Sequence, residues 1–178
     1  MDPYVECPTA TTKSFIIRLI SEYDSEAIYQ CYHDKAAVEL MNDDNCDFGF
    51  YVDTKEQMAD TIGYWIDFYQ KRYFIRFTIV DGTTEKAVGT MEGFGGEIGV
   101  LRVDIASAYE RANYLSEILT FAKDNFYDFF GNKYLVTKAI PKASERRMAL
   151  DENGWEFIDK FRGYQDYYKV KTKFGDSL

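Results

Sequence analysis

One segment shows the expected architecture most clearly: Glu97-Ile-Gly-Val-Leu-Arg-Val-Asp-Ile-Ala-Ser-Ala-Tyr-Glu-Arg-Ala-Asn-Tyr-Leu-Ser-Glu-Ile-Leu119. Residues 98–105 predict a strand, with Leu101, Val103 and Ile105 on one apolar face. Ser107 and Glu110 then form a capping box, which predicts the start of a helix. This helix continues to the Gly131-Asn132 pair, which is typical of a helix end. Its apolar residues recur at helical spacing: Leu115, Ile118, Leu119, Ala122, Phe126, Phe129 and Phe130.

Further strands and helices flank this unit on both sides. Apolar and β-branched runs predict strands, and capping residues such as Thr54 with Gln57 predict helix starts. In chain order we expect a strand at 15–19, helices at 24–32 and 54–71, a hairpin of strands 73–80 and 87–92, the strand and long helix described above, a strand at 134–139, a helix from Pro141 to Asn153-Gly154, and a hairpin of strands 155–161 and 164–170. Because no linker or internal repeat interrupts this order, we expect one domain.

The composition is that of a folded protein. Of its 178 residues, 46% are hydrophobic and 17% aromatic, and the net charge is -9. This acidity argues against a nucleic-acid partner, and no apolar run approaches the ~20 residues that cross a bilayer, so we also expect no membrane partner. The beginning of the chain has no signal-peptide pattern, and Cys7, Cys31 and Cys46 form no metal or disulfide motif. We therefore expect a cytoplasmic protein with reduced thiols and no metal.

Two parts of the chain carry a family resemblance. Glu97-Ile98-Gly99 looks like an E-I-G strand opening, Tyr109 like the aromatic residue before a turn, and Tyr114-Leu-Ser-Glu117 like a Y-A-S-E helix start. Residues 143–155 resemble the N-x-x-S-x-x-x-x-E-K-x-G-F block of the same family. These patterns resemble the GCN5-related N-acetyltransferase (GNAT) superfamily, in the branch typified by ribosomal-protein alanine acetyltransferases, and the likeness of layout covers most residues from 15 to 170.

The resemblance implies a fold and an activity. The fold is α/β, a mixed, twisted central sheet flanked by about four helices, in a single acyl-CoA N-acyltransferase-like domain over residues 1–178 with loose ends at 1–13 and 174–178. The activity is transfer of an acetyl group from acetyl-CoA to the primary amine of a small cationic molecule or a peptide N-terminus, by a monomer or homodimer. A general base must take up the proton of the amine, and Glu97, followed by Glu92, is our candidate. The cofactor-binding candidates are Val103, Ile105, Arg111, Ala112, Asn113, Tyr114 and Leu115.

Several motif positions differ from the family pattern. Arg111 and Asn113 replace glycines of a turn whose backbone N–H groups would face the cofactor pyrophosphate. Glu110 beside them would repel an anion. In the later block Ala143 and Arg146 replace the usual Asn and Ser, and Leu150 replaces a tyrosine that often acts as the acid. An alternative function follows, in which the chain is a catalytically degenerate ligand-binding or protein-interaction module on this fold.

Two groups of side chains leave alternatives open. Residues 138–147 contain four cationic side chains, which form either a patch for an anionic ligand or a solvated helix face: Lys138, Lys142, Arg146 and Arg147. Trp65, Phe68 and Tyr69 on the predicted helix at 54–71 either line an acceptor cleft or pack in the core.

Overall fold

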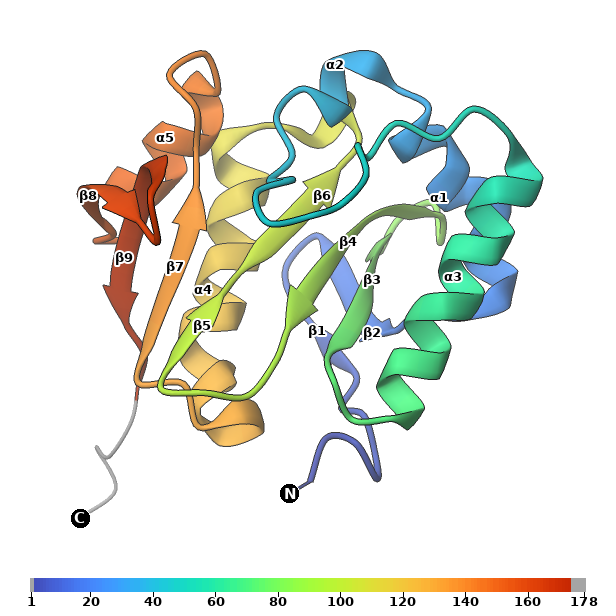
Figure 1. The fold of residues 1–178 in the computed structure, drawn as a ribbon, viewed down its shortest axis with the longest axis horizontal. Helices are drawn as coiled ribbons and strands as arrows, with labels where there is room; N and C mark the ends of the chain where they lie inside the picture. The colour runs from blue at the N-terminus through green and yellow to red at the C-terminus, as the bar shows by residue number, and fades with distance from the viewer. Residues whose placement is uncertain (1, 174–178) are drawn as a thin grey trace.

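Two β-sheets form the centre of the protein in the computed structural model, which describes residues 2–173 (Figure 1). Their strand orders are β1-β2-β3-β4-β6 and β5-β7-β9-β8. The strands are β1 (Ala10–Thr11), β2 (Phe15–Leu19), β3 (Ile75–Asp81), β4 (Ala87–Gly93), β5 (Ile98–Val100), β6 (Arg102–Ile105), β7 (Tyr134–Lys138), β8 (Glu156–Phe161) and β9 (Tyr164–Lys171). The helices are α1 (Ser25–Tyr32), α2 (Lys35–Val38), α3 (Lys55–Gln70), α4 (Ala112–Phe130) and α5 (Ser144–Glu152), with short 3-10 turns η1 (Glu22–Asp24) and η2 (Ser107–Tyr109). The expected α/β class with a mixed sheet is confirmed, because β5 and β7 are parallel while the other pairs are antiparallel.

The stretch expected as one strand, residues 98–105, is divided at Leu101. On one side β5 pairs with β7, and on the other β6 pairs with β4. Gly99 permits close packing here, since a Cβ at this position would lie 2.7 Å from Oδ1 of Asn132. Because the chain changes partner at Leu101, β6 and β7 belong to different sheets and diverge beyond this residue (Figure 1).

The long helix α4 covers the apolar face of the first sheet and lies behind β5 and β6 in Figure 1. It forms one core cluster with Phe77, Met91 and Val103 from three neighbouring strands. Burial of each large apolar side chain contributes about 1.5–3 kcal/mol. The helix ends at Gly131, whose φ of 73° is left-handed, as the Gly-Asn pair predicted. The core residues that α4 contributes are Ala112, Leu115, Ile118, Leu119, Phe121, Ala122, Phe126 and Phe130.

The opposite face of this sheet is polar, and α1 and α3 cover it. Since side chains alternate along a strand, Arg76 points away from the face that Phe77 occupies. The guanidinium of Arg76 lies 4.4 Å from the ring centre of Trp65 on α3. Ile28 on α1 and Met58 on α3 belong to a second core cluster. The sheet therefore separates an apolar layer from a layer that contains buried charges.

The predicted order of strands and helices is confirmed, with short additions. The capping residue of α3 is also confirmed, because Thr54 Oγ1 accepts the Gln57 N–H. The unpredicted helix α2 follows Asp34, whose carboxylate accepts two backbone N–H groups of its first turn. Four residues give too short an apolar pattern to predict a helix from spacing.

The segment before β2 differs from the loose end that we expected at 1–13. Within residues 2–13, β1 pairs with β2. Glu117 of α4 holds this segment, since it accepts hydrogen bonds from Thr12 Oγ1 at 2.7 Å and from Ser14 N at 2.8 Å. The expected loose end at 174–178 lies outside the described residues, as does Met1. Among residues 2–173, no helix is long and apolar enough to cross a membrane.

Candidate functional site

A ladder of polar side chains crosses the first sheet on the face that α1 and α3 cover. Two rows run across β3, β4 and β6, in the order Arg76-Glu92-Arg102 and Thr78-Thr90-Asp104. All but Arg102 are buried. The ladder has a sequence signal that we did not use, which is the alternation of polar and apolar residues in the ranges 75–79 and 102–105.

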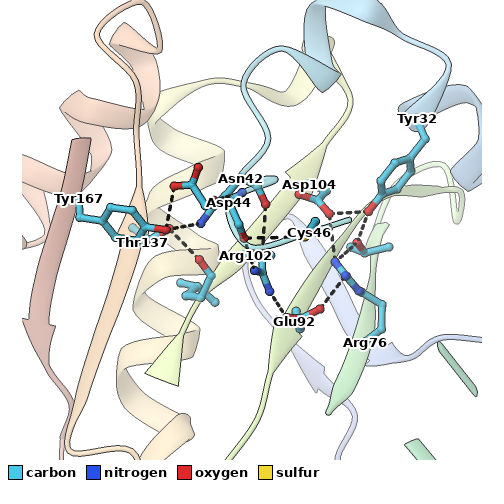
Figure 2. Close-up of polar contacts among 12 residues, drawn as sticks. Tyr32, Asn42, Asp44, Cys46, Arg76, Glu92, Arg102, Asp104, Thr137 and Tyr167 are labelled. Carbon is cyan, nitrogen blue, oxygen red and sulfur yellow. Dashed lines mark hydrogen bonds and ion pairs between the residues drawn. The ribbon is translucent and has the colours of Figure 1, made fainter. Parts of the chain in front are cut away.

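The charges of this ladder neutralise one another (Figure 2). Arg76 donates to Glu92 at 2.7 Å and to Asp104 at 3.0 Å, and Arg102 donates to the other oxygen of Glu92 at 2.6 Å. Tyr32 of α1 donates to Asp104 at 2.5 Å. Burial raises the pKa of Asp104, because its charged form loses contact with water. Two buried atoms of the ladder have no hydrogen-bond partner, Nε of Arg76 and Oδ1 of Asp104.

A pocket of about 810 Å³ opens beside the row of Arg76, Glu92 and Arg102. This volume lies within the range of small-molecule sites. Trp65 and Phe68 line it, whereas Tyr69 stacks on Tyr4 elsewhere. Half of its lining residues are aromatic, and they come from α1, the α2–α3 loop, α3 and the segments next to β3 and β4: Tyr32, Phe48, Phe50, Tyr51, Tyr64, Trp65, Phe68, Tyr73, Phe74 and Phe94.

The structure separates the two carboxylates that we considered as general base. Glu92 lines the pocket, but each of its oxygens accepts a hydrogen bond from an arginine. Glu97 precedes β5, its side chain is 67% exposed, and it lies 3.6 Å from the Lys133 ammonium. Glu97 is not among the residues that line the pocket. The two carboxylates therefore do not form one site.

The residues that we expected to bind the cofactor lie on β6 and at the start of α4. Val103, Ile105, Ala112 and Leu115 are buried in the α4 core cluster, and Tyr114 packs against it. Arg111 and Asn113 are exposed. Their role in cofactor binding stays a prediction.

The first turn of α4 already has a carboxylate partner. Ala112 N donates to Oε2 of Glu145 on α5 at 2.7 Å. The expected capping box of Ser107 and Glu110 is wrong, because Ser107 begins η2 and α4 begins only at Ala112. The side chain of Glu110 turns instead toward α5. A helix N-terminus attracts anions through its free N–H groups and its dipole, and Glu145 accepts one of these N–H groups.

Glu110 forms a buried ion pair with Arg146. Nε and Nη2 of Arg146 donate to the two oxygens of Glu110, both at 2.8 Å. The side chains are only 8% and 5% exposed, respectively. Arg146 stands at a position where the resemblance led us to expect a different side chain, and its charge complements that of Glu110. This complementarity was visible in the sequence, but nothing there placed the two residues together.

The cationic side chains of residues 138–147 do not form a free patch. Lys138 pairs with Asp44, Lys142 with Glu39, Arg146 with Glu110 and Arg147 with Asp166. Each positive charge thus has a carboxylate partner, which removes the proposed patch for an anionic ligand.

The α2–α3 loop joins the diverging strands beyond Leu101 (Figure 2). Asp44 accepts hydrogen bonds from Lys138 of β7 at 2.6 Å and from Tyr167 of β9 at 3.1 Å. Arg102 of β6 donates to the backbone oxygens of Asn42 and Asp44. Burial raises the pKa of Tyr167 to about 12, so this bridge keeps its phenol proton at neutral pH.

These features decide whether the site fits acetyl-CoA, which the resemblance implies. A pyrophosphate at the start of α4 would meet the carboxylates of Glu110 and Glu145, and the one arginine buried there is already paired. No glycine lies between Gly99 and Gly131 to let the backbone approach the ligand closely. The residues present do not fit the group.

The chain matches no protein-family model and no curated protein. Solved structures do match. A ribosomal-protein-S5-alanine acetyltransferase from Vibrio fischeri is 14% identical over 96% of this chain and 98% of the other, with a TM-score of 0.69. An acetyltransferase of the GNAT family from Bacillus anthracis is 14% identical over 92% and 98%, also with a TM-score of 0.69.

A third solved structure contains a bound cofactor. It is a ribosomal L7/L12 alpha-N-protein acetyltransferase in complex with coenzyme A, 12% identical over 93% of this chain and 98% of the other, with a TM-score of 0.66. Identities this low establish the fold and nothing more. The resemblance that the sequence suggested is confirmed at this level, and the chain has the fold of the GCN5-related N-acetyltransferases, including those that modify ribosomal proteins.

Proposed function

We propose that this chain is a non-catalytic ligand-binding protein on an acetyltransferase fold, with the aromatic pocket as its binding site. The observation that carries the proposal is the start of α4, where Glu145 occupies a helix N–H and Glu110 pairs with Arg146. In this account the chain's own charges have replaced the cofactor pyrophosphate.

The energetics favour this proposal over an open cofactor site. Binding of a pyrophosphate at α4 requires that the Ala112–Glu145 hydrogen bond and the Glu110–Arg146 pair break or move. Separating this pair takes the Glu110 carboxylate, which is buried, away from the one cation that pairs with it in the described part of the chain, and this cost weakens binding of the cofactor.

The groups available for proton transfer also favour a non-catalytic protein. A general base must be free to reach the amine, whereas both oxygens of Glu92 are held by arginines and Glu97 lies outside the pocket. Leu150, at the position where the resemblance implies a tyrosine acid, is fully buried. Neither of the two predicted bases is therefore free at this pocket, and the predicted position of the acid holds no titratable group.

A second candidate function is N-acetyl transfer from acetyl-CoA to a small cationic or peptide amine. The observation that favours it is the similarity in fold to acetyltransferases such as the coenzyme A complex. It requires a conformation in which Glu110 and Arg146 separate. Either function is compatible with a monomer or a homodimer in one domain.

A thermal-shift titration with acetyl-CoA, coenzyme A and ATP tests the proposal. A ligand at about 100 times its dissociation constant adds about 2.7 kcal/mol, which raises the melting temperature of a domain of this size by roughly 5–10 °C. We expect no shift at millimolar concentration. A shift with both coenzyme A forms, but not with ATP, would contradict the proposal and establish the second candidate's cofactor site.

A matched pair of double variants shows whether the ion pair is the cause. Glu110→Gln with Arg146→Ser removes the buried pair, and we expect it to gain affinity for acetyl-CoA. Glu39→Gln with Lys142→Ser removes an exposed pair near α5 and should leave affinity unchanged. Equal behaviour of the two variants would assign the loss of binding to some other feature of the turn.

A further inference from the structure

Exposed aromatic rings gather at the rim of the 810 Å³ pocket. Phe48 on the α2–α3 loop, Tyr64 on α3 and Tyr73 just before β3 line it, yet these three rim residues are 84%, 66% and 64% exposed, respectively. Three of the eight exposed large hydrophobic residues in the described part of the chain thus lie at one site. Exposed apolar groups that gather in this way and are bordered by polar residues mark interaction sites. A small molecule inside the pocket would leave the rim rings in water, whereas a protein segment laid across the rim would cover them.

The walls of this pocket are acidic. Residues 39–70, which comprise the α2–α3 loop and α3, contain eight acidic side chains and one basic side chain, Lys55, which pairs with Glu26 of α1. Three of the eight carboxylates pair with lysines: Glu39 with Lys142, Asp44 with Lys138 and Asp67 with Lys71. The other five are exposed, have no ion-pair partner among the residues that the structure describes, and each lie within two residues of a side chain that lines the pocket: Asp43, Asp47, Asp53, Glu56 and Asp60. Such a concentration of one charge attracts cations over a long range.

The floor of the pocket carries balanced charges. Arg76 and Arg102 both pair with Glu92, and Arg76 also pairs with Asp104. Two arginines therefore face two carboxylates. The uncompensated charge at this pocket is that of its acidic walls, which favours a cationic partner over an anionic one.

The chain itself places cations over two rings of this pocket. The Arg76 guanidinium lies 4.4 Å from the ring centre of Trp65, and the Lys35 ammonium lies 5.7 Å from that of Tyr51. A cation within about 6 Å of a ring centre is attracted by the negative face of the ring. Within residues 2–173 no cation lies over the three rim rings. These rings are the places where a partner's cation can bind in the same way.

We propose that this pocket is a docking site for an arginine-rich segment of a partner protein, with guanidinium groups over the rim rings and opposite the acidic walls. Arginine suits both contacts, because its planar guanidinium stacks on rings and is more weakly hydrated than an ammonium. A second copy of this chain does not suit them, since a two-fold interface would place the same acidic walls against each other. The inference rests on the proposed function, because it names the partner of the same pocket, and it requires neither a free N-terminus on the partner nor acetyl transfer.

Short peptides of equal length test the class of partner. In each, glycine alternates with arginine, lysine or glutamate, and both ends are blocked so that no terminal charge or free amine contributes. Calorimetric titration measures their binding. We expect the arginine peptide to bind about two- to fivefold more tightly than the lysine peptide, which corresponds to about 0.5–1 kcal/mol. The glutamate peptide should not bind, and added salt should weaken binding of the arginine peptide, because salt screens exposed charges.

Matched variants locate the site. Tyr64→Ala removes a rim ring and should weaken binding of the arginine peptide about two- to fivefold. Tyr23→Ala removes a ring that is 97% exposed among acidic residues but lies outside this pocket, and it should have no effect. Asp47→Asn should weaken binding more than Asp128→Asn, which removes an exposed charge from α4 on the opposite face of the sheet. Because all four side chains are exposed, we expect every variant to fold.

Several results would overturn the assignment. They are absence of binding by the arginine peptide at about 1 mM and low salt, equal affinity for the glutamate peptide, and equal effects of Tyr64→Ala and Tyr23→Ala. Equal affinity for a linear polyamine of the same charge would assign the site to a small polycation instead. Peptide binding that appears only with a free N-terminal amine would favour the second candidate function. A thermal shift with acetyl-CoA would contradict the proposed function and leave the peptide result standing.

Discussion

Arg146→Ala is the perturbation that the structure makes most informative. It removes a guanidinium that is 5% exposed and leaves the Glu110 carboxylate, 8% exposed, without either of its hydrogen bonds at 2.8 Å. A buried charge left alone is far less stable than a buried pair, because desolvation is no longer offset. The partner change, Glu110→Gln, leaves the arginine charge in the same position.

The magnitude follows from this burial. We expect Arg146→Ala to lower the free energy of unfolding by about 3–5 kcal/mol, which for this chain length is about 6–20 °C in melting temperature. The double variant Glu110→Gln with Arg146→Met removes both charges and should recover most of the loss, because neutral groups of similar volume replace a buried pair at little cost. Lys142→Ala breaks an exposed pair with Glu39 and should cost about 1 kcal/mol or less.

Urea unfolding followed by tryptophan fluorescence measures these proteins together with the single variant Arg146→Met. A double-mutant cycle of Glu110→Gln and Arg146→Met then gives the coupling between the two positions, which we expect to exceed about 2 kcal/mol. The reasoning would be refuted if Arg146→Ala lowered the free energy of unfolding by less than about 1 kcal/mol. It would also be refuted if the double variant lost as much stability as the two single variants together, because the two residues would then not be coupled.

Three further perturbations have expected outcomes of their own. Burial alone would raise the pKa of Asp24, but the hydrogen bonds from Arg18 and its other partners outweigh burial and leave the pKa below its usual value. The stability that Asp24 contributes is therefore present above about pH 4 and is lost as the pH falls further. Asp24→Asn should make the free energy of unfolding depend less on pH in this acid range, and an unchanged pH dependence would count against this. Phe126→Ala, in the α4 core, should cost about 3–5 kcal/mol in urea unfolding, and a cost below about 1 kcal/mol would show that the core is looser than described. Cys46 is exposed and Cys31 is buried, so a thiol reagent should modify Cys46 first. A thiol that still reacts fast in the Cys46→Ser variant would be inconsistent with this placement.

Local patterns were enough to predict most of the elements. The spacing of apolar residues from Leu115 to Phe130 predicted α4, and Gly131 predicted its end, because both signals act within one or two turns. Gly-containing turns likewise predicted the two hairpins. The division of the central strand at Leu101 could not be predicted in this way, since it depends on which distant strands pair on either side.

For the candidate site, too, features that depend on neighbouring residues could be predicted, and contacts between distant residues could not. Glu92 was recognised as a candidate, but the arginines that hold it come from neighbouring strands, and Arg76 was missed. Ser107 and Glu110 had the local spacing of a capping box, yet Arg146, 36 residues further along, draws the glutamate away. The turn that departs from the family pattern was visible from residue types alone, whereas its closure by Glu145 required the packing of α5 on α4.

The central claim is that groups of the chain itself at the start of α4, Glu145 on the Ala112 N–H and the Glu110–Arg146 pair, prevent pyrophosphate binding there. Amide resonances of residues 110–115 report on this turn directly in a titration of isotope-labelled protein with acetyl-CoA. The account predicts that these resonances stay in place at millimolar ligand in the natural chain and move only when Glu110 and Arg146 are both replaced. Saturable shifts at Ala112 and its neighbours in the natural chain would contradict it and establish a working acetyl-CoA site.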